Sequence, residues 1–242
     1  MYKQNKMISI NEVYIAVQAI LNKSQRGFLK PSEFNTFSQN AMSQLYKEIK
    51  DEVSIGDSSI IKGKANKKIT EQASDALDGF FKPATLSLSG NIYPKPSDFD
   101  FFGVTGGLYI NDIEISKVTL HESKLLETIP YMKPMSETPV FIEYEDGYEV
   151  VSSGIDTDIL IYYNRVPKIP IWTYVVINGD IVYDASHPNL QDFELPNFYF
   201  NQIVEKVLFL AGMNIRDKEL LGTMISKENA DELIDYRNKT LA

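Results

Sequence analysis

The chain contains no cysteine. Disulfide bonds, thiolate nucleophiles and cysteine-ligated zinc sites are therefore excluded. Histidine is scarce as well, because only His121 and His187 occur, and neither stands in a metal-binding spacing such as His-Glu-x-x-His. The Gly-x-Ser-x-Gly turn that carries the nucleophile of many serine hydrolases is also missing. We interpret both histidines as ordinary polar residues of the surface or of loops.

Basic residues are outnumbered, with 24 Lys and Arg against 33 Asp and Glu, and the formal net charge is −9. This balance argues against a dedicated nucleic-acid binder, which would present a basic surface. It still permits passing contact with DNA, because an acidic wall lining a channel repels phosphates and keeps DNA from sticking. No stretch approaches the roughly 20 apolar residues that span a bilayer, and the first residues lack the apolar run of a signal peptide. We expect a soluble protein without a membrane anchor.

Apolar residues make up 43% of the chain, enough for a sizeable core. The clearest pattern lies at 197–212, where apolar residues recur at helical spacing: Phe200, Ile203, Val204, Val207, Leu208 and Ala211. Pro196 stands just ahead of this helix, and Gly212 follows the last periodic residue, where helices often end. The segment carries no catalytic group, which favours an assembly component over an enzyme.

The first third also predicts helices. Ser9 and Glu12 match a capping box, and apolar residues follow at helical spacing up to Leu21. After a short turn at 22–29, Pro31 begins a second helix that extends to about Val53, and the two helices should pair as an antiparallel hairpin. Residues 54–67 are interpreted as a mobile loop. A shorter helix is expected from 68 to 81, ended by Pro83.

Residues 84–185 change to alternating patterns and predict an antiparallel β-domain. Strands are expected at 112–122 and 158–165. Hairpins are expected at 140–150, across Asp146-Gly147, and at 172–183, across Asn178-Gly179. Helices return at 197–212 and at about 216–237. The predicted fold class is α+β, with helical segments at 1–83 and 186–242. In this arrangement the C-terminal helices pack back on the N-terminal helical hairpin, so that both segments form one domain.

Several patterns resemble chemical sites but favour simpler interpretations. Asp156-x-Asp158 precedes a β-run and not the rest of a calcium loop. The glycine-rich segment 103–107 lacks the Lys-Ser/Thr of a phosphate loop and is interpreted as a turn before a strand. Carboxylates gather at one hairpin (Glu143, Glu145, Asp146 and Glu149), and the one basic cluster has no interleaved aromatics (Lys62, Lys64, Lys67 and Lys68). We predict no catalytic, metal-binding or cofactor-binding residue, no cofactor, and no enzymatic activity.

Aromatic residues are plentiful, at 12% of the chain. They gather in three places: Phe99, Phe101 and Phe102; Tyr162 and Tyr163; and Phe198, Tyr199 and Phe200. Aromatic side chains anchor protein interfaces. Filling the core of the β-domain accounts for at least half of them.

Several segments, in order along the chain, resemble the structural proteins of crAss-like and related tailed phages. The matching words are Ile10-Asn-Glu-Val-Tyr14, Val17-Gln18, Ile20-Leu-Asn22, Gln25-Arg26-Gly27-Phe28, Pro31-Ser-Glu-Phe34-Asn35, Arg165-Val-Pro167-Lys-Ile-Pro170-Ile-Trp172, Phe193-Glu194-Leu195-Pro196, Ile203-Val-Glu-Lys-Val-Leu208, Ala211-Gly212 and Ile215-Arg216-Asp217. The resemblance is to ring or adaptor proteins of the head–tail connector or tail.

This resemblance implies a homo-oligomeric ring of about twelve copies in the virion neck or tail, with the portal or neighbouring tail ring proteins as partners. It implies no activity, metal or cofactor. On this hypothesis Arg26 and Gly27 set the turn between the first two helices, and the segment 193–196 fixes how the chain enters the C-terminal helix. Two alternatives stay open. One is a hydrolase that uses the acidic hairpin at 143–149. The other is a monomeric module whose aromatic β-domain holds a ligand.

Overall fold

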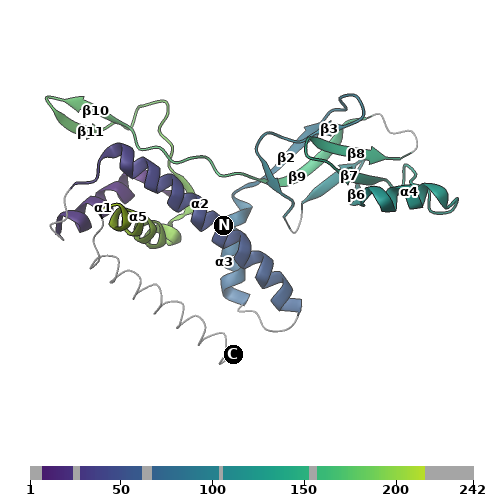
Figure 1. Cartoon of the computed structure of the whole chain (residues 1–242), viewed down its shortest axis with the longest axis horizontal. Helices are drawn as coiled ribbons and strands as arrows, with labels where there is room; N and C mark the ends of the chain where they lie inside the picture. Colours follow the sequence, from purple (N-terminus) through teal and green to yellow (C-terminus); the bar gives the residue numbers. More distant parts are fainter. Residues whose placement is uncertain (1–6, 24–27, 62–66, 104–105, 153–156, 216–242) are drawn as a thin grey trace, which may run out of the picture. The chain divides into compact units, whose positions relative to one another are not determined.

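The computed structural model describes residues 7–23, 28–61, 67–103, 106–152 and 157–215 (Figure 1). Its helices are α1 (Ile10–Lys23), α2 (Pro31–Ile61), α3 (Lys67–Asp78), α4 (Leu120–Thr128), the 3-10 turn η1 (Asn197–Tyr199) and α5 (Phe200–Ile215). Its strands are β1 (Met7–Ile8), β2 (Phe81–Leu86), β3 (Tyr93–Pro94), β4 (Phe99–Phe101), β5 (Gly107–Ile110), β6 (Ile113–Lys117), β7 (Val140–Glu143), β8 (Gly147–Val151), β9 (Ile159–Arg165), β10 (Tyr174–Ile177), β11 (Asp180–Tyr183) and β12 (Phe193–Pro196). The fold class is α+β, as predicted.

The chain divides into two compact units. Unit 1 combines residues 1–79 with 167–242, and unit 2 is Phe80–Val166. The hairpin β10–β11 therefore belongs to the helical unit 1, whereas the sequence-based boundary at residue 185 placed it in the β-domain. The physical reason is that β10 and β11 pair with each other and not with the large sheet, and the chain just before them packs on the helices.

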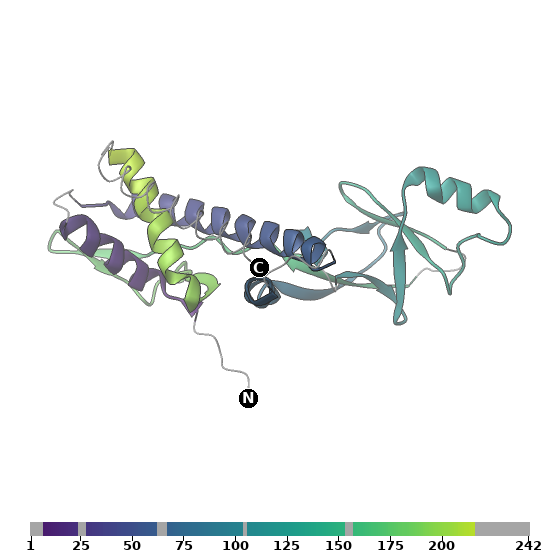
Figure 2. The same ribbon diagram turned by 90° about the horizontal axis from the view of Figure 1, so that it is seen from below.

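In unit 1, α5 lies against both α1 and α2, as Figures 1 and 2 show from two sides. Its predicted apolar stripe is confirmed, because Ile203, Val207 and Ala211 are fully buried. Lys206 of α5 forms an ion pair with Glu48 of α2, with 2.6 Å between Nζ and Oε1. The segment 193–196 that precedes the helix is strand β12, which pairs with β1 near the start of the chain.

Two helices of unit 1 extend further than expected. Helix α5 continues to Ile215, so Gly212 lies inside the helix and does not end it. Helix α2 continues to Ile61, so residues 54–61 are helical and not part of a loop. A glycine inside a helix costs about 1 kcal/mol relative to alanine, which tertiary packing readily offsets. Neither extension, 54–61 or 212–215, contains a proline, the residue that would stop a helix outright.

The third helix is shorter than expected. Helix α3 ends at Asp78, and Phe81 already begins β2. Pro83, expected to end the helix, lies inside β2 opposite Tyr162 of β9. Strand β2 is the outermost strand of its sheet, where a residue without an N–H group is tolerated.

Unit 2 is built on one large sheet with the strand order β2-β9-β5-β6-β7-β8-β3, and β4 pairs with β9 beside this path. The pairs are antiparallel except β6 with β7, which run parallel. A parallel pair needs a crossover connection, and α4 supplies it. The sequence interpretation missed α4, because residues 112–122 were taken together as strand. The predicted hairpin at 140–150 and the predicted strand at 158–165 are confirmed. The turn was expected across Asp146-Gly147, but Gly147 already belongs to β8, and the backbone N–H of Tyr144 donates to its carbonyl, so the chain turns at Glu145 and Asp146.

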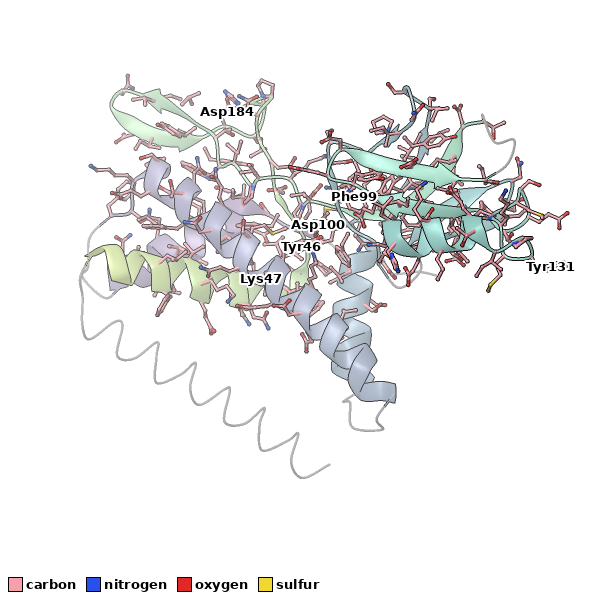
Figure 3. The ribbon with its side chains drawn as sticks, turned by 45° about the vertical axis from the view of Figure 1, so that its right-hand side comes forward. Tyr46, Lys47, Phe99, Asp100, Tyr131 and Asp184 are labelled. Atoms are coloured by element: carbon pink, nitrogen blue, oxygen red, sulfur yellow. The ribbon has the colours of Figure 1, made fainter. Side chains whose placement is uncertain are left out.

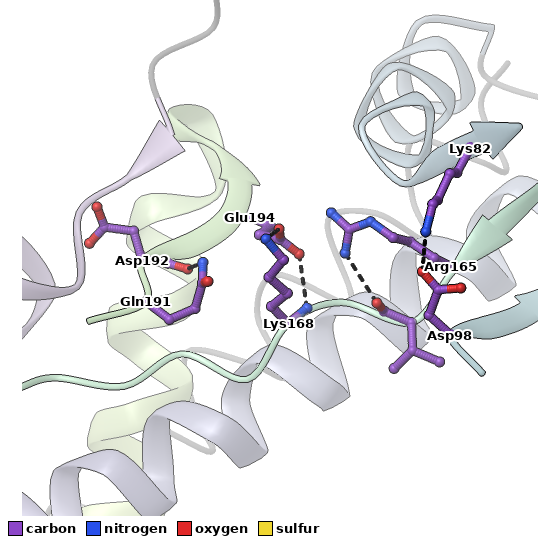
Figure 4. Close-up of polar contacts among 8 residues, drawn as sticks. Lys82, Asp98, Arg165, Lys168, Gln191, Asp192 and Glu194 are labelled. Carbon is purple, nitrogen blue, oxygen red and sulfur yellow. Dashed lines mark hydrogen bonds and ion pairs between the residues drawn. The ribbon is translucent and has the colours of Figure 1, made fainter. Parts of the chain in front are cut away.

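The core of unit 2 is strongly aromatic. Phe99, Phe102 and Phe141 surround Tyr148, with ring centroids between 5.6 and 6.2 Å from that of Tyr148. The hydroxyl of Tyr163 donates a hydrogen bond to Asp98, which also forms an ion pair with Lys82 (Figure 4). Phe99, Phe102 and Tyr163 therefore belong to the core of unit 2. This agrees with the expectation that filling the core of the β-domain accounts for many of the aromatic residues.

Candidate assembly interface

The hairpin β10–β11 is apolar and exposed. Most of its side chains are large hydrophobic groups between 40% and 63% exposed: Tyr174, Val175, Val176, Ile177, Ile181 and Val182. Summed over both faces of the hairpin, they expose on the order of 500 Å² of apolar surface, comparable with the largest apolar patch of a typical soluble monomer, which is often functional. Asp180 is the one charged residue between 174 and 183. Such a surface is typical of a site that another protein chain covers.

A tight two-residue turn, Asn178-Gly179, connects the strands of this hairpin. Asn178 and Gly179 have φ angles of 54° and 93°, both in the left-handed region. A two-residue turn with both central residues in this region matches the right-handed twist of the flanking strands, and Asn-Gly is its preferred sequence. The pairing runs in register from Tyr174 opposite Tyr183 to Ile177 opposite Asp180. The local sequence thus specifies the turn and the register of the hairpin.

The two faces of the hairpin differ in their surroundings. Side chains alternate along a strand, and directly paired residues share a face. The outer face consists of Val175, Ile177 and Val182, with Asp180 at its end; the inner face consists of Tyr174, Val176, Ile181 and Tyr183. The inner face is tied to the helices at its base, because the ring of Trp172 stacks on both Tyr174 and Tyr183. The outer face is turned away from that contact.

Trp172 anchors the hairpin to the helices. Only 2% of this residue is exposed, and its ring stacks on Tyr14 of α1 with 4.0 Å between centroids. Its indole N–H donates to Asn11 Oδ1 at 3.1 Å. Burial raises the pKa of the Tyr14 phenol and outweighs the opposing effect of its hydrogen bond with Gln18. The hairpin therefore projects from a rigid aromatic support.

Asn35 of α2 fixes the backbone of the same residue. Its side-chain Oδ1 accepts the N–H of Trp172 at 2.8 Å, and its Nδ2 donates to the carbonyl of Trp172 at 3.0 Å. One amide side chain thus pairs with both backbone groups, as a neighbouring strand would. Next to it, the Thr173 hydroxyl donates to the Asp184 carbonyl at 2.7 Å, which closes the base of the hairpin. Figure 3 labels Asp184, whose carbonyl accepts this hydrogen bond.

The segment that leads into the hairpin is also held within unit 1. The backbone N–H of Lys168 donates to Glu194 of β12 at 2.8 Å, and the Lys168 ammonium lies 3.7 Å from the same carboxylate (Figure 4). Ile171 and Gln191 exchange two backbone hydrogen bonds. These contacts place β12 beside the approach to the hairpin.

A shallow groove separates the hairpin tip from α1. Its volume is about 590 Å³. Its lining residues come from α1, from Phe28 and from the turn: Tyr14, Gln18, Asn22, Phe28, Gly179, Asp180 and Ile181. The groove is open to solvent, and its walls mix amide, carboxylate and aromatic groups without a cluster of titratable side chains. This favours a contact surface over a small-molecule site.

A second exposed apolar surface lies on unit 2. It comprises Leu125 of α4 and the segment that follows, with Tyr131 98% exposed and Met132 and Met135 more than half exposed. Figure 3 labels Tyr131 beyond the end of α4. The sequence interpretation missed this surface. The sequence nevertheless indicates it. Residues 129–139 hold three prolines (130, 134 and 139), and their apolar residues follow neither helical nor strand spacing, which is typical of an exposed loop.

The acidic hairpin does not bring Glu143 and Glu149 together. Glu143 pairs with Tyr148, and Glu149 pairs with Ile142, so Glu143 and Glu149 lie on opposite faces of β7–β8. Glu143 forms ion pairs with Lys95 at 2.9 Å and with Lys117 at 2.5 Å. Burial raises its pKa, but the hydrogen bonds from both lysines outweigh burial and hold the pKa below its usual value. A carboxyl with a lowered pKa is poorly suited to act as a general acid.

The other sequence candidates stay separate. His121 is exposed on α4, and Nδ1 of His187 accepts the backbone N–H of Asn189 in a loop. Asp158 is exposed just before β9. Other positions lie outside the described residues: Arg26, Gly27, Lys62, Lys64, Thr105, Asp156 and the expected helix at 216–237. Lys67 and Lys68 begin α3.

Over the described ranges, no group of three or more His, Cys, Asp or Glu side chains is arranged to hold a metal ion. Within the same part of the chain, none of the helices has the length and apolarity needed to cross a membrane. No protein-family model matches the sequence, and no curated protein sequence matches it. The resemblance to phage connector proteins therefore rests on the sequence motifs given above.

Proposed function

We propose that this chain is a ring-forming adaptor of the head–tail connector or tail of a tailed phage. It bridges the portal and the tail and lines a channel for DNA and ejected proteins. The observation that carries the proposal is the exposed apolar hairpin β10–β11, held on a rigid support by Trp172. The motif resemblance points to the same class. The ring contains about twelve copies, by analogy with that family.

The size of the hairpin patch is consistent with cooperative assembly. A contact on one face covers about half of the roughly 500 Å² of exposed apolar surface and contributes on the order of 5 kcal/mol before association costs, which are of similar size. One contact alone is therefore weak, whereas a closed ring gives every copy two contacts. The net charge of −9 opposes association elsewhere on the surface and suits a channel wall that DNA passes.

The finer helix arrangement belongs to the same proposal. In it, α1 and α2 form the N-terminal hairpin, and the C-terminal helices pack back on them as one domain. Unit 1 then makes the lateral contacts of the ring. The surface around Tyr131 on unit 2 contacts the portal or a neighbouring tail ring protein, because Tyr and Met side chains are favoured in such contacts.

The test is the mass of the assembly in solution, measured by light scattering over a range of concentrations. Wild type should exceed the monomer mass of 27.5 kDa and approach a closed ring, whose copies are then counted by electron microscopy. A variant with Val175→Thr and Val182→Thr keeps side-chain shape and strand propensity, yet it should shift the equilibrium to monomers. Val166→Thr, at a residue 50% exposed in unit 2, is the matched control.

A wild-type chain that stays monomeric in solution and is absent from purified virions contradicts the proposal. A chain that is monomeric alone but forms a ring in the virion means that the portal templates assembly.

A further inference from the structure

Asn178-Gly179 is the only Asn-Gly pair in the sequence. It forms the tip of the hairpin β10–β11, and both residues are exposed. An asparagine that is followed by glycine is especially prone to spontaneous deamidation, because glycine has no Cβ to hinder attack by its backbone nitrogen on the asparagine side chain. The residues that suit the turn of this hairpin therefore also make its tip chemically reactive.

The surroundings of the turn leave this reaction unhindered. A Cβ built on Gly179 would meet no atom within 4 Å, so the backbone at this position stands in open space. Over the described residues, neither the side-chain amide of Asn178 nor the N–H of Gly179 takes part in a hydrogen bond. The two reacting groups can therefore approach each other without first breaking a contact of this part of the structure.

We propose that Asn178 is a site of spontaneous deamidation, and that the product disables the hairpin β10–β11. The backbone nitrogen of Gly179 loses its proton to hydroxide and bonds to Cγ of Asn178. The Cγ–Nδ2 bond breaks, and the side-chain nitrogen takes a proton from water and leaves as ammonia. Water then opens the resulting imide ring at one of its two carbonyl carbons. The reaction consumes one water molecule, releases one ammonia molecule and involves no oxidation or reduction.

The two ways of opening the ring have different structural results. Opening at Cγ gives aspartate, and Asp-Gly suits the same turn as Asn-Gly. Opening at the backbone carbonyl gives isoaspartate, in which the main chain runs through Cβ and Cγ and gains one atom. A two-residue loop closes the hairpin between Ile177 and Asp180, so an added backbone atom disrupts the pairing that continues to Tyr174 and Tyr183. Isoaspartate is therefore the product that disables the hairpin.

A second turn of the chain provides an internal comparison. Asn111 and Asp112 connect β5 and β6, with φ angles of 44° and 64°, and Ile110 pairs with Ile113 across them. This turn is also exposed, and its backbone is left-handed at both positions. It differs in the residue that follows the asparagine, because the Cβ of Asp112 hinders attack by its backbone nitrogen. Asn111 should therefore stay largely unmodified while Asn178 reacts.

The consequence for assembly rests on the proposed ring function. The paired strands present Val175 and Val182 on the outer face of the hairpin. A chain that carries isoaspartate at position 178 loses this pairing, so it should not enter a ring. Deamidation thus limits how long an unassembled copy stays able to assemble.

Peptide mapping by mass spectrometry tests the site. The full chain is incubated at mildly alkaline pH, and the conversion of each asparagine to aspartate or isoaspartate is followed over time. Asn178 should convert about tenfold faster than Asn111, because only Asn178 precedes a residue without a Cβ. The Asp112→Gly variant, which creates a second Asn-Gly turn, should bring Asn111 to a similar rate.

Two results would overturn this assignment. One is equal conversion of Asn111 and Asn178 in the wild-type chain. The other is an Asn178 that stays intact in the folded chain over a period in which it converts fully in the same chain unfolded by urea.

Fluorescence follows the hairpin itself. Tyr174 and Tyr183 stack on Trp172, the only tryptophan of the chain, so loss of the paired strands changes the fluorescence of Trp172. Ageing should change this signal in the wild type but not in Asn178→Gly, because Gly-Gly forms the same turn and cannot deamidate. Freshly purified Asn178→Asp carries the added charge without the added backbone atom and should resemble unaged wild type. Unchanged Trp172 fluorescence in fully converted wild type overturns the predicted loss of the hairpin.

Light scattering of the same samples separates this inference from the proposed function. Aged wild type should lose assembled mass in proportion to its isoaspartate content, whereas aged Asn178→Gly should not. Aged wild type that assembles like fresh protein overturns the predicted loss of assembly. A fresh wild type that never assembles counts against the proposed function alone, because the conversion of Asn178 and the fluorescence of Trp172 are measured independently of assembly.

Discussion

The support beneath the hairpin predicts a specific loss of stability when Asn35 is replaced by alanine. Asn35 satisfies the N–H and the carbonyl of Trp172 at 2.8 and 3.0 Å. Trp172 is only 2% exposed, so water does not readily replace the amide. Truncation to alanine leaves one buried donor and one buried acceptor without their partner. The change adds no steric clash, because alanine is smaller and favours the helix.

The magnitude follows from the cost of unmet hydrogen bonds. Each buried polar group left unsatisfied costs about 1–3 kcal/mol, and the gain in helix propensity returns roughly half a kcal/mol. We expect Asn35→Ala to lower the free energy of unfolding of unit 1 by about 2–4 kcal/mol. At a typical urea dependence of about 2 kcal/mol per molar, the midpoint falls by about 1–2 M.

Intrinsic fluorescence is the assay, because Trp172 is the only tryptophan of the chain and reports on this site alone. Asn40→Ala is the matched control, since Asn40 is an exposed residue of the same helix. That change should be neutral or slightly stabilising. A midpoint for Asn35→Ala that matches the control within about 0.3 M would refute the reasoning, because the two hydrogen bonds would then contribute nothing net.

Three further predictions concern unit 2. Gly147→Ala places a Cβ 2.3 Å from the backbone oxygen of Tyr93, so the β3–β8 pairing should be lost, with a fall in melting temperature of about 10 °C or more. Thr119→Ala removes the capping box of α4 and should cost about 1 kcal/mol in urea unfolding, whereas Thr119→Ser should cost little. The hydrogen bond from Lys82 holds the pKa of Asp98 below its usual 3.8; the stability this adds is complete above that value and is lost as pH falls through the lowered pKa. The stability difference between wild type and Asp98→Asn should therefore shrink below about pH 4 in acid titrations followed by circular dichroism.

Local chemistry explains which parts of the fold the sequence could predict. The hairpin at 174–183 was predictable because Asn178-Gly179 supplies the turn chemistry that a two-residue loop requires. The hairpin at 140–150 was predictable from the alternating apolar residues of its two strands. Helix α5 was predictable because its apolar spacing covers three turns. These signals act within a few residues of each other and do not depend on what the chain packs against.

Helix α4 shows a local signal that was present but overlooked. Thr119 and Glu122 form a capping box, in which each side chain accepts from the backbone of the other. The alternating apolar residues of 113–120 outweighed that signal in the sequence interpretation. Helices α2 and α5 extend to Ile61 and Ile215, beyond the predicted ends, because a glycine inside a helix costs only about 1 kcal/mol and neither extension contains a proline.

The candidate interface was the hardest feature to predict. Asn35 and Trp172 lie 137 positions apart, and nothing in the spacing of either residue indicates their pairing. The exposure of the hairpin follows from its attachment to unit 1, because the same apolar strand would be buried if it joined the large sheet. The phage ring assignment and the absence of enzymatic activity remain predictions from the sequence motifs.

Charge and apolarity act against each other in the proposed assembly, and this opposition yields a last prediction. Exposed apolar strands with unpaired edges invite uncontrolled association. A net charge of −9 keeps copies apart until local concentration or a template overcomes the repulsion. Raising the salt from about 0.05 to about 0.5 M shortens the screening length several-fold and should lower the concentration needed for assembly. Light scattering at both salt concentrations measures this shift, with Val175→Thr, Val182→Thr as the control. If the higher salt concentration instead dissociated the assembly, ion pairs and not the apolar hairpin would hold the copies together.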